Sequence, residues 1–219
     1  MILCHRQMKK GGIRMPSETF FRLPESKQER IIEAIKEEIS RVPFENFSIN
    51  NVIHQCGISR GSFYQYFHNK EDIYLYLIST YQHLIFQNAK EKLAESGGDF
   101  FAALEATFRH AVRMLCYKDS KAFRHNLFCN FRLYEMLWSH SAYTEESREE
   151  VEQLFPLVDL SLLKIDSPEE FRILFGICMI NCLKDVAGIF ISDDNEQKVL
   201  ENFLQKLALL RRGYAKEQN

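Results

Sequence analysis

Apolar side chains recur along this chain with the spacing of helices, whereas strand-like alternation is confined to short stretches such as residues 188–192. Isoleucines at every fourth position over 31–39 predict a helix at about 26–42. This helix should stop at Pro43, because proline and the residue before it disfavour helical backbone.

A second, shorter helix follows from four apolar positions with the i, i+3, i+4, i+7 spacing, which are Ile49, Val52, Ile53 and Cys56. Ser48 is its predicted N-cap and Gly57 its terminator. After the short connection of Gly57 and Ile58, Ser59 is expected to cap a third helix. Two short helices joined by a glycine turn are typical of helix-turn-helix DNA readers.

The third predicted helix has an apolar and a polar side. Phe63 and Phe67 lie four residues apart and should face inward, while Arg60, Ser62 and Gln65 point elsewhere. The window from residue 46 to residue 70 contains no Asp or Glu, so a polyanion could approach it without repulsion. From charge alone, a chance gap in acidic residues is an equally good interpretation.

The rest of the chain also predicts helices. A long amphipathic pattern begins near Lys70 and ends at Gly97 and Gly98, and further helices are expected over 99–117, 120–139 and 144–160. Two strong apolar stripes, one after Pro168 and one after the turn at 193–195, predict an antiparallel helix pair at the C-terminus. The fold class is therefore all-α.

Composition narrows the class of protein. The 219 residues are 46% hydrophobic and 26% charged with a net charge of −2, which predicts a folded chain. Residues 1–70 carry 11 basic against 7 acidic residues, which leaves 17 against 23 for the remainder. No apolar run is long enough for a membrane span, and the N-terminus lacks a signal-peptide core. We therefore expect a cytoplasmic protein with reduced thiols and no disulfides.

Residues 1–24 form a leader that is rich in breakers. Lys10, Gly11 and Gly12 lie shortly before Met15 and could be a translated ribosome-binding sequence, so the hypothesis is that the true start is Met15. The alternative is a basic arm that tracks DNA.

The string from Ser48 to Ile73 resembles the N-terminal DNA-binding domain of the tetracycline-repressor (TetR) family of bacterial regulators. The matching residues are Gly57-Ile58-Ser59, Ser62-Phe63-Tyr64, Phe67, Asn69-Lys70-Glu71 and Ile73. The motif covers about 26 residues, or near 50 with the first helix. Ile53, where the family often has alanine, and Cys56 depart from the pattern.

The resemblance and the chemistry of the side chains give a set of candidate DNA contacts: Ser48, Asn50, Arg60, Gly61, Ser62, Tyr64, Gln65, Tyr66 and Lys70. The Arg60 guanidinium could bind guanine O6 and N7 in a bidentate contact. Ser48 could offer its hydroxyl and backbone N–H to a phosphate at a helix N-terminus. By resemblance, Lys70 contacts phosphate. For each of these residues an ordinary cap or a solvated surface position is the alternative.

The other candidates follow similar reasoning. Gly61 lacks a side chain and would let the backbone approach the duplex closely. Ser62 and Gln65 can reach base edges or phosphate, and Asn50 could touch a base from the second helix. Tyr64 and Tyr66 could contact sugar-phosphate or thymine methyl groups, with the alternative that one of the two tyrosines belongs to the core.

The resemblance implies an all-α dimer of about nine helices per chain, with a three-helix DNA-binding domain over 25–70 and an effector-binding and dimerisation domain over 71–219. In such a dimer the last two helices of each chain form the interface. The predicted interface residues are Phe171, Phe175, Cys178, Cys182, Val186, Phe203, Leu207 and Leu210. The two recognition helices would then meet successive major grooves of a pseudo-palindromic operator.

By the same resemblance, a small effector would bind the larger domain, tilt the long helix from Lys70 onward and release the operator; an effector that promotes DNA binding is the alternative. Residues 81–179 are rich in Phe, Met and Tyr, which favours an apolar or aromatic effector. The candidate pocket residues are Phe108, Phe128, Arg132, Trp138, Phe175 and Met179, for each of which an ordinary core or surface position is the alternative. His125 with Cys129, and Cys178 with Cys182, have a spacing that metal ligands could use, but core thiols are preferred. We expect no cofactor, metal or membrane partner.

No sequence motif of catalysis is present, so no enzymatic activity is expected. The leading interpretation is a dimeric, ligand-responsive repressor. The first alternative is a DNA-binding activator or architectural protein of the same fold without an effector. The second is a helical protein-binding or enzymatic module whose helix-turn-helix is vestigial.

Overall fold

The computed structural model describes residues 16–117, 120–128, 152–191 and 195–216. These ranges are helical apart from turns and one isolated antiparallel bridge between Leu163 and Ala215, which confirms the all-α fold class. Within them, no helix combines the length and the apolar character needed to cross a bilayer. The leader up to residue 15, and the candidates Arg132, Trp138 and Cys129, lie outside these ranges.

The chain forms two compact units that are each built from two stretches of sequence. The first combines residues 1–82 with 119–146, and the second combines 83–118 with 147–219. The expected domain boundary at residue 70 falls at the start of a long helix, Lys70–Glu95, that is divided between the two units at residue 82. The boundary at residue 70 therefore stays a prediction.

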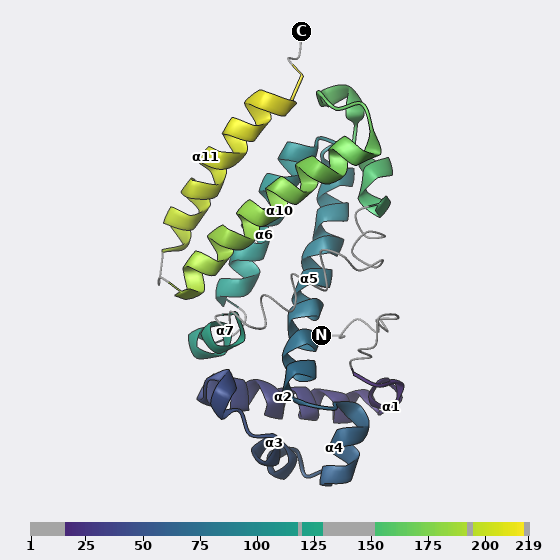
Figure 1. The fold of residues 1–219 in the computed structure, drawn as a ribbon, viewed down its shortest axis with the longest axis vertical. Helices are drawn as coiled ribbons and strands as arrows, with labels where there is room; N and C mark the ends of the chain where they lie inside the picture. Colours follow the sequence, from purple (N-terminus) through teal and green to yellow (C-terminus); the bar gives the residue numbers. More distant parts are fainter. Residues whose placement is uncertain (1–15, 118–119, 129–151, 192–194, 217–219) are drawn as a thin grey trace. The chain divides into compact units, whose positions relative to one another are not determined.

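The first unit contains the three helices that the N-terminal pattern predicts (Figure 1). They are α2 (Glu25–Arg41), α3 (Ile49–Cys56) and α4 (Arg60–Tyr66), with α1 (Glu18–Phe21) before them and the 3-10 turn η1 (Phe44–Asn46) between α2 and α3. Val42 has extended backbone, because the ring of the following Pro43 disfavours helical backbone at the residue before it. This ends α2. The isoleucine stripe of α2 is fully buried.

A further helix of the first unit, α7 (Lys121–Phe128), packs against α2. The Asn126 side-chain amide donates to the Ile39 carbonyl over 2.7 Å. The remainder of the helix expected over 120–139 lies outside the described residues.

The long helix α5 (Lys70–Glu95) begins in a reciprocal cap. The Asn69 side chain accepts from the Asp72 N–H over 2.8 Å, and Asp72 accepts from the His68 N–H over 2.9 Å. This arrangement satisfies amides that a helix start leaves unpaired. At the other end, Gly97 and Gly98 have φ values of 61° and 86°, the left-handed backbone that ends a helix.

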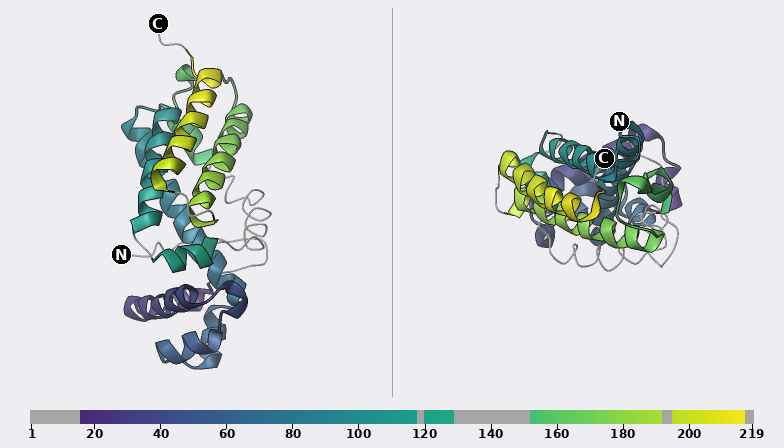
Figure 2. Two further views of the ribbon diagram at one scale, coloured as in Figure 1. Left: turned by 90° about the vertical axis from the view of Figure 1, so that its left-hand side faces the viewer. Right: turned by 90° about the horizontal axis from the view of Figure 1, so that it is seen from above.

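The second unit is built mainly from α6 (Phe100–Tyr117), α10 (Pro168–Ile191) and α11 (Glu196–Tyr214). α10 and α11 lie side by side and antiparallel, as the two apolar stripes predict (Figures 1 and 2). Residues 188–191, which show strand-like alternation, are helical. The helix expected over 144–160 does not continue to its predicted end, because short 3-10 turns η2 (Phe155–Leu157) and η3 (Leu160–Leu162) follow residue 154.

Candidate nucleic-acid interface

The turn between α3 and α4 has the geometry that its residue types predict. Gly57 has φ 65° and ψ 37°, and the N–H of Ile58 donates back to the Ile53 carbonyl over 3.3 Å. The Ser59 hydroxyl then accepts from the Ser62 N–H over 3.1 Å and caps α4. The glycine and the serine therefore set the angle at which α4 leaves α3.

The outer face of α4 carries most of the predicted DNA contacts. Arg60, Gly61, Tyr64 and Gln65 are exposed, and Ser62 is half-buried. Tyr66 differs, because only 4% of its surface is exposed. It therefore belongs to the core, which was the alternative for one of the two tyrosines, and it is not available to contact DNA.

Arg60 is held by two other predicted residues. Its Nη1 donates to the Asn50 side-chain oxygen over 3.3 Å, and its guanidinium lies over the Tyr64 ring at 5.6 Å from the ring centre. α3 and α4 thus hold one cation between them on an exposed surface. A guanidinium restrained in this way loses less side-chain entropy when it binds a base.

Ser48 caps α3, but half of its predicted phosphate chemistry is used inside the protein. Its hydroxyl accepts from the Asn51 N–H over 3.4 Å, and its own backbone N–H donates to the Glu38 carboxylate over 3.1 Å. The N–H is therefore not available to a phosphate. The hydroxyl can still donate to one, so this part of the prediction remains untested.

Glu38 is the residue that sequence reasoning missed. It is 3% exposed on α2 and accepts from the Ser48 N–H, from the Asn51 amide over 3.1 Å and from the Arg41 guanidinium in two bonds of 2.8 Å. Burial favours the neutral acid, but these donors together outweigh it and lower the pKa of Glu38. The signal was an acidic residue in phase with Ile31 and Ile35 on the buried stripe of α2.

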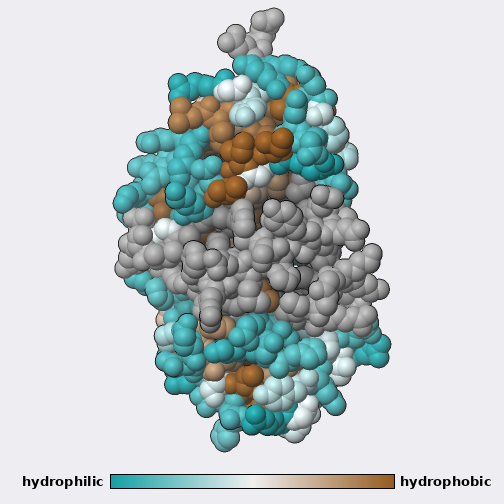
Figure 3. All heavy atoms as spheres, in the orientation of Figure 1, coloured by the Kyte–Doolittle hydropathy of each residue, from teal (hydrophilic) through white to brown (hydrophobic). Residues whose placement is uncertain are grey.

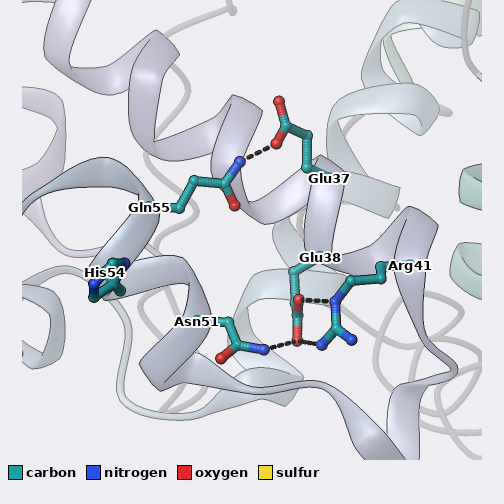
Figure 4. A pocket seen from close by; sticks show the side chains of 6 residues that line it. All are labelled: Glu37, Glu38, Arg41, Asn51, His54 and Gln55. Carbon is teal, nitrogen blue, oxygen red and sulfur yellow. Dashed lines mark hydrogen bonds and ion pairs between the residues drawn. The ribbon is translucent and has the colours of Figure 1, made fainter.

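Glu38 and its partners form one side of an open polar hollow between α2 and α3 (Figure 4). Its lining residues are Glu37, Glu38, Arg41, Asn51, His54 and Gln55. Gln55 donates to Glu37 across the hollow, so two separate side-chain pairs connect the helices here. These polar groups bind one another, and their hydrogen bonds hold α3 on α2.

Lys70 stands at the start of α5 with its ammonium group directed into the protein. It donates to the carbonyls of Phe44 and Glu45 over 2.9 and 3.3 Å and lies 4.3 Å from the centre of the Phe44 ring. It therefore binds the turn η1 to α5. A phosphate contact would use the remaining N–H donor of the ammonium group, and this contact stays a prediction.

Two family models match this chain. The model of bacterial regulatory proteins of the tetR family matches residues 31–77, and the tetracyclin repressor-like C-terminal domain matches residues 99–214, which is more than half of the chain. The chain belongs to the TetR family. Members of this family are DNA-binding regulators rather than enzymes, and they usually bind DNA as dimers.

Solved TetR structures share the fold. SmeT, the repressor of the Stenotrophomonas maltophilia multidrug efflux pump SmeDEF, is 15% identical over 88% of this chain and 94% of SmeT, with a TM-score of 0.57. The SmeT–triclosan complex covers 88% and 93% at the same identity with a TM-score of 0.65. A TetR-family regulator from Pectobacterium atrosepticum is 12% identical over 90% and 100%, with a TM-score of 0.60. Among curated proteins, none matches this chain.

The effector candidates of this TetR protein lie in different surroundings. Phe108 is buried and stacks on Phe203 with ring centres 3.7 Å apart, so it is a core residue of the second unit. Phe175 and Met179 are half-buried against the same core. Phe128 belongs to the first unit and packs edge-on against Tyr81.

The predicted dimer residues of α10 and α11 mostly face the interior of their own unit. Phe171, Cys178, Cys182, Phe203 and Leu207 are buried in its core, and Phe175, Val186 and Leu210 are half-buried beside it. Burial raises the pKa of the Cys178 thiol to about 12, so it stays neutral as a core thiol does. In the described part of the chain, no three potential metal ligands lie together.

Another face of these two helices is apolar and exposed. Ile173 and Ile180 of α10 are 58% and 50% exposed, and Leu209 of α11 is 61% exposed. Hydrophobic surface gathers over this helix pair in Figure 3. An exposed apolar face of this kind is suited to contact with a second protein, and the position of the dimer interface stays a prediction.

Proposed function

We propose that this TetR-family protein is a homodimeric transcriptional repressor that acts in the cytoplasm. In this proposal α4 reads a pseudo-palindromic operator, and a small apolar or aromatic effector releases the protein from it. The observation that carries the proposal is the exposed guanidinium of Arg60, held between Asn50 and Tyr64 within a stretch, residues 46–70, that contains no acidic residue.

The chemistry of this surface suits the major groove. A guanidinium presents two parallel N–H donors that match guanine O6 and N7. Gln65 and Ser62 offer hydrogen bonds on the same helix, and Tyr64 offers an aromatic edge to a thymine methyl group. The Ser48 hydroxyl at the start of α3 suits a backbone phosphate.

Replacing Arg60 tests this proposal. We expect Arg60→Ala to weaken operator binding by about 1–3 kcal/mol, or roughly 5- to 150-fold, and to relax the preference at one base pair. Gel shift on the upstream region of the protein's own gene, with single-base variants of the bound site, measures both effects. Arg212→Ala is the matched control, because it removes another exposed cation, on α11.

Two results would contradict the role of α4. One is that the wild-type protein has no specific site in that DNA at any salt concentration. The other is that Arg60→Ala, like the control Arg212→Ala, binds the operator with the affinity and the base preference of the wild type.

The effector part of the proposal is supported by the apolar interior of the second unit and by the triclosan complex of SmeT. Thr107 and Asn88 add two buried oxygen atoms with no partner among the described residues. They favour an effector that combines an apolar body with a hydrogen-bond donor.

A thermal-shift panel of aromatic compounds, with and without a donor group, tests the effector. We expect at least one donor-bearing compound both to raise the melting temperature and to weaken operator binding. To change operator occupancy from 99:1 to 1:99, it must favour the released state by about 5.5 kcal/mol. If every stabilising compound leaves operator affinity intact, the proposed inducer mechanism is wrong.

A further inference from the structure

The short helix α1 is bonded to the C-terminal end of α4. The Ser17 N–H donates to the Tyr66 carbonyl over 3.0 Å, and the Ser17 hydroxyl donates to the Gln65 carbonyl. The last carbonyls of any helix have no partner within the helix itself. Although Ser17 occupies the N-cap position of α1, its hydroxyl makes no capping bond there, so both donors serve α4.

Phe20 adds an apolar contact to these polar ones. Its ring is fully buried, and its centre lies 5.3 Å from that of Phe67 and 6.1 Å from those of Tyr66 and Tyr76. Tyr66 and Phe67 are at the end of α4, and Tyr76 is on α5. Phe20 therefore fills the space between the end of the recognition helix and the start of the long helix.

α1 is itself anchored to α2. The buried side chain of Gln28 donates to the carbonyls of Leu23 and Phe21 over 2.8 and 3.4 Å, which satisfies the end of α1. A continuous set of contacts thus leads from α2 through α1 to α4. The tetR-family model begins at residue 31, so α1 precedes the part of the chain that it matches.

We propose that α1 with Ser17 is a brace that positions the recognition helix, and that Ser17 and Phe20 are positioning residues for DNA reading. α4 has seven residues, and a helix this short is unstable without outside contacts. Gln65, a predicted base contact, lies in the turn whose carbonyls Ser17 satisfies. Operator affinity falls in proportion to the fraction of molecules in which this turn is formed.

The experiment uses the full chain and a graded series of variants. Ser17→Ala removes the hydroxyl donor, and Ser17→Pro removes both donors at a residue whose φ of −64° proline accepts. Phe20→Leu reduces the aromatic contact while keeping an apolar side chain. Thr19→Ala is the control, because it changes an exposed residue of the same helix.

Amide hydrogen exchange without DNA is the first readout. We expect the amides of α4 to exchange at least about fivefold faster in Ser17→Pro and Phe20→Leu, with a smaller change in Ser17→Ala, while α2 keeps its wild-type rates. Equal acceleration over all helices of the unit would mean that α1 only stabilises the fold, and it would overturn the proposal. Unchanged exchange in α4 would overturn it as well.

Operator binding is the second readout, and it rests on the proposed reading role of α4. We expect at least about threefold weaker binding with an unchanged salt dependence, because the variants remove no phosphate contact. Faster exchange in α4 with unaltered affinity would show that the turn does not read DNA. If the wild-type protein itself binds no operator, the proposed function fails, while the exchange experiment still decides whether α1 holds α4.

Discussion

Glu38 shows that a charged residue within an apolar helical pattern can have a structural role. A carboxylate in phase with buried isoleucines reads as a defect of the apolar stripe, since burying an unpaired charge is costly. In the structure the charge has four hydrogen bonds, two of which come from the beginning of α3. Glu38 thus determines where α3 starts relative to α2.

Glu38→Gln should destabilise the protein by about 1–3 kcal/mol at pH 7, because an amide cannot accept all four bonds and leaves Arg41 without its partner. The folded pKa of Glu38 is below its ordinary value of 4.5, so the carboxylate contributes stability that is complete above that value. This contribution is lost as the pH falls through the folded pKa. Urea unfolding of both proteins between pH 7 and pH 3 measures the difference.

Glu33→Gln is the control for this experiment, since it changes an exposed carboxylate of the same helix. We expect the gap between wild type and Glu38→Gln to close towards acid pH and the control to change little. A gap of constant size over the whole range would show that the charge of Glu38 contributes nothing.

At the scale of elements, the helix-turn-helix depends on two glycines with different roles. Gly57 needs its left-handed backbone, and a Cβ placed there would meet nothing within 4 Å, so only the strain counts. Gly61 lies in the first turn of α4 with ordinary helical backbone, and the nearest atom to an added Cβ is the Ser59 hydroxyl at 4.0 Å. Its lack of a side chain is therefore not required for folding.

Alanine at these two positions should change stability in opposite directions. Gly57→Ala is expected to destabilise the fold by about 1–2 kcal/mol, since a left-handed alanine is strained. Gly61→Ala should stabilise it by roughly 0.5–1 kcal/mol, because alanine favours helix. If Gly61 lets the backbone approach the duplex, the stabler variant will still bind operator more weakly. Thermal unfolding measures the stability of each variant, and gel shift measures its operator affinity. Equal operator affinity of the wild type and Gly61→Ala would place Gly61 outside the interface.

At the scale of the whole molecule, α10 is apolar on more than one side. The stripe that contains Phe171 and Cys178 is occupied by the core of its own unit, and Ile173 and Ile180 face outward. A sequence pattern cannot tell which apolar side of a helix meets its own chain and which meets a partner. We therefore propose that the outward side of these two helices forms the dimer interface.

A charge on this outward side should break the dimer. We expect Ile180→Glu to be monomeric at micromolar concentration in sedimentation equilibrium, because a buried unpaired carboxylate opposes association. Leu157→Glu is the control, since Leu157 is 40% exposed on η2 rather than on the helix pair. A dimeric Ile180→Glu protein would place the interface elsewhere.

The sequence alone determined the helices of the DNA-binding unit, their caps and the turn at Gly57. These depend on local chemistry, namely hydrophobic period, capping side chains and left-handed glycine, which act over a few residues. Family membership was visible for the same reason, because the motif from 48 to 73 is contiguous.

Only the tertiary structure decided which side chains far apart in the chain contact one another. It paired Glu38 with the start of α3, buried Tyr66 beneath Phe20, and turned Lys70 towards the carbonyls of η1. It also chose which apolar side of α10 is core. Each of these depends on the partner that folding brings near, and no spacing along the sequence encodes that partner.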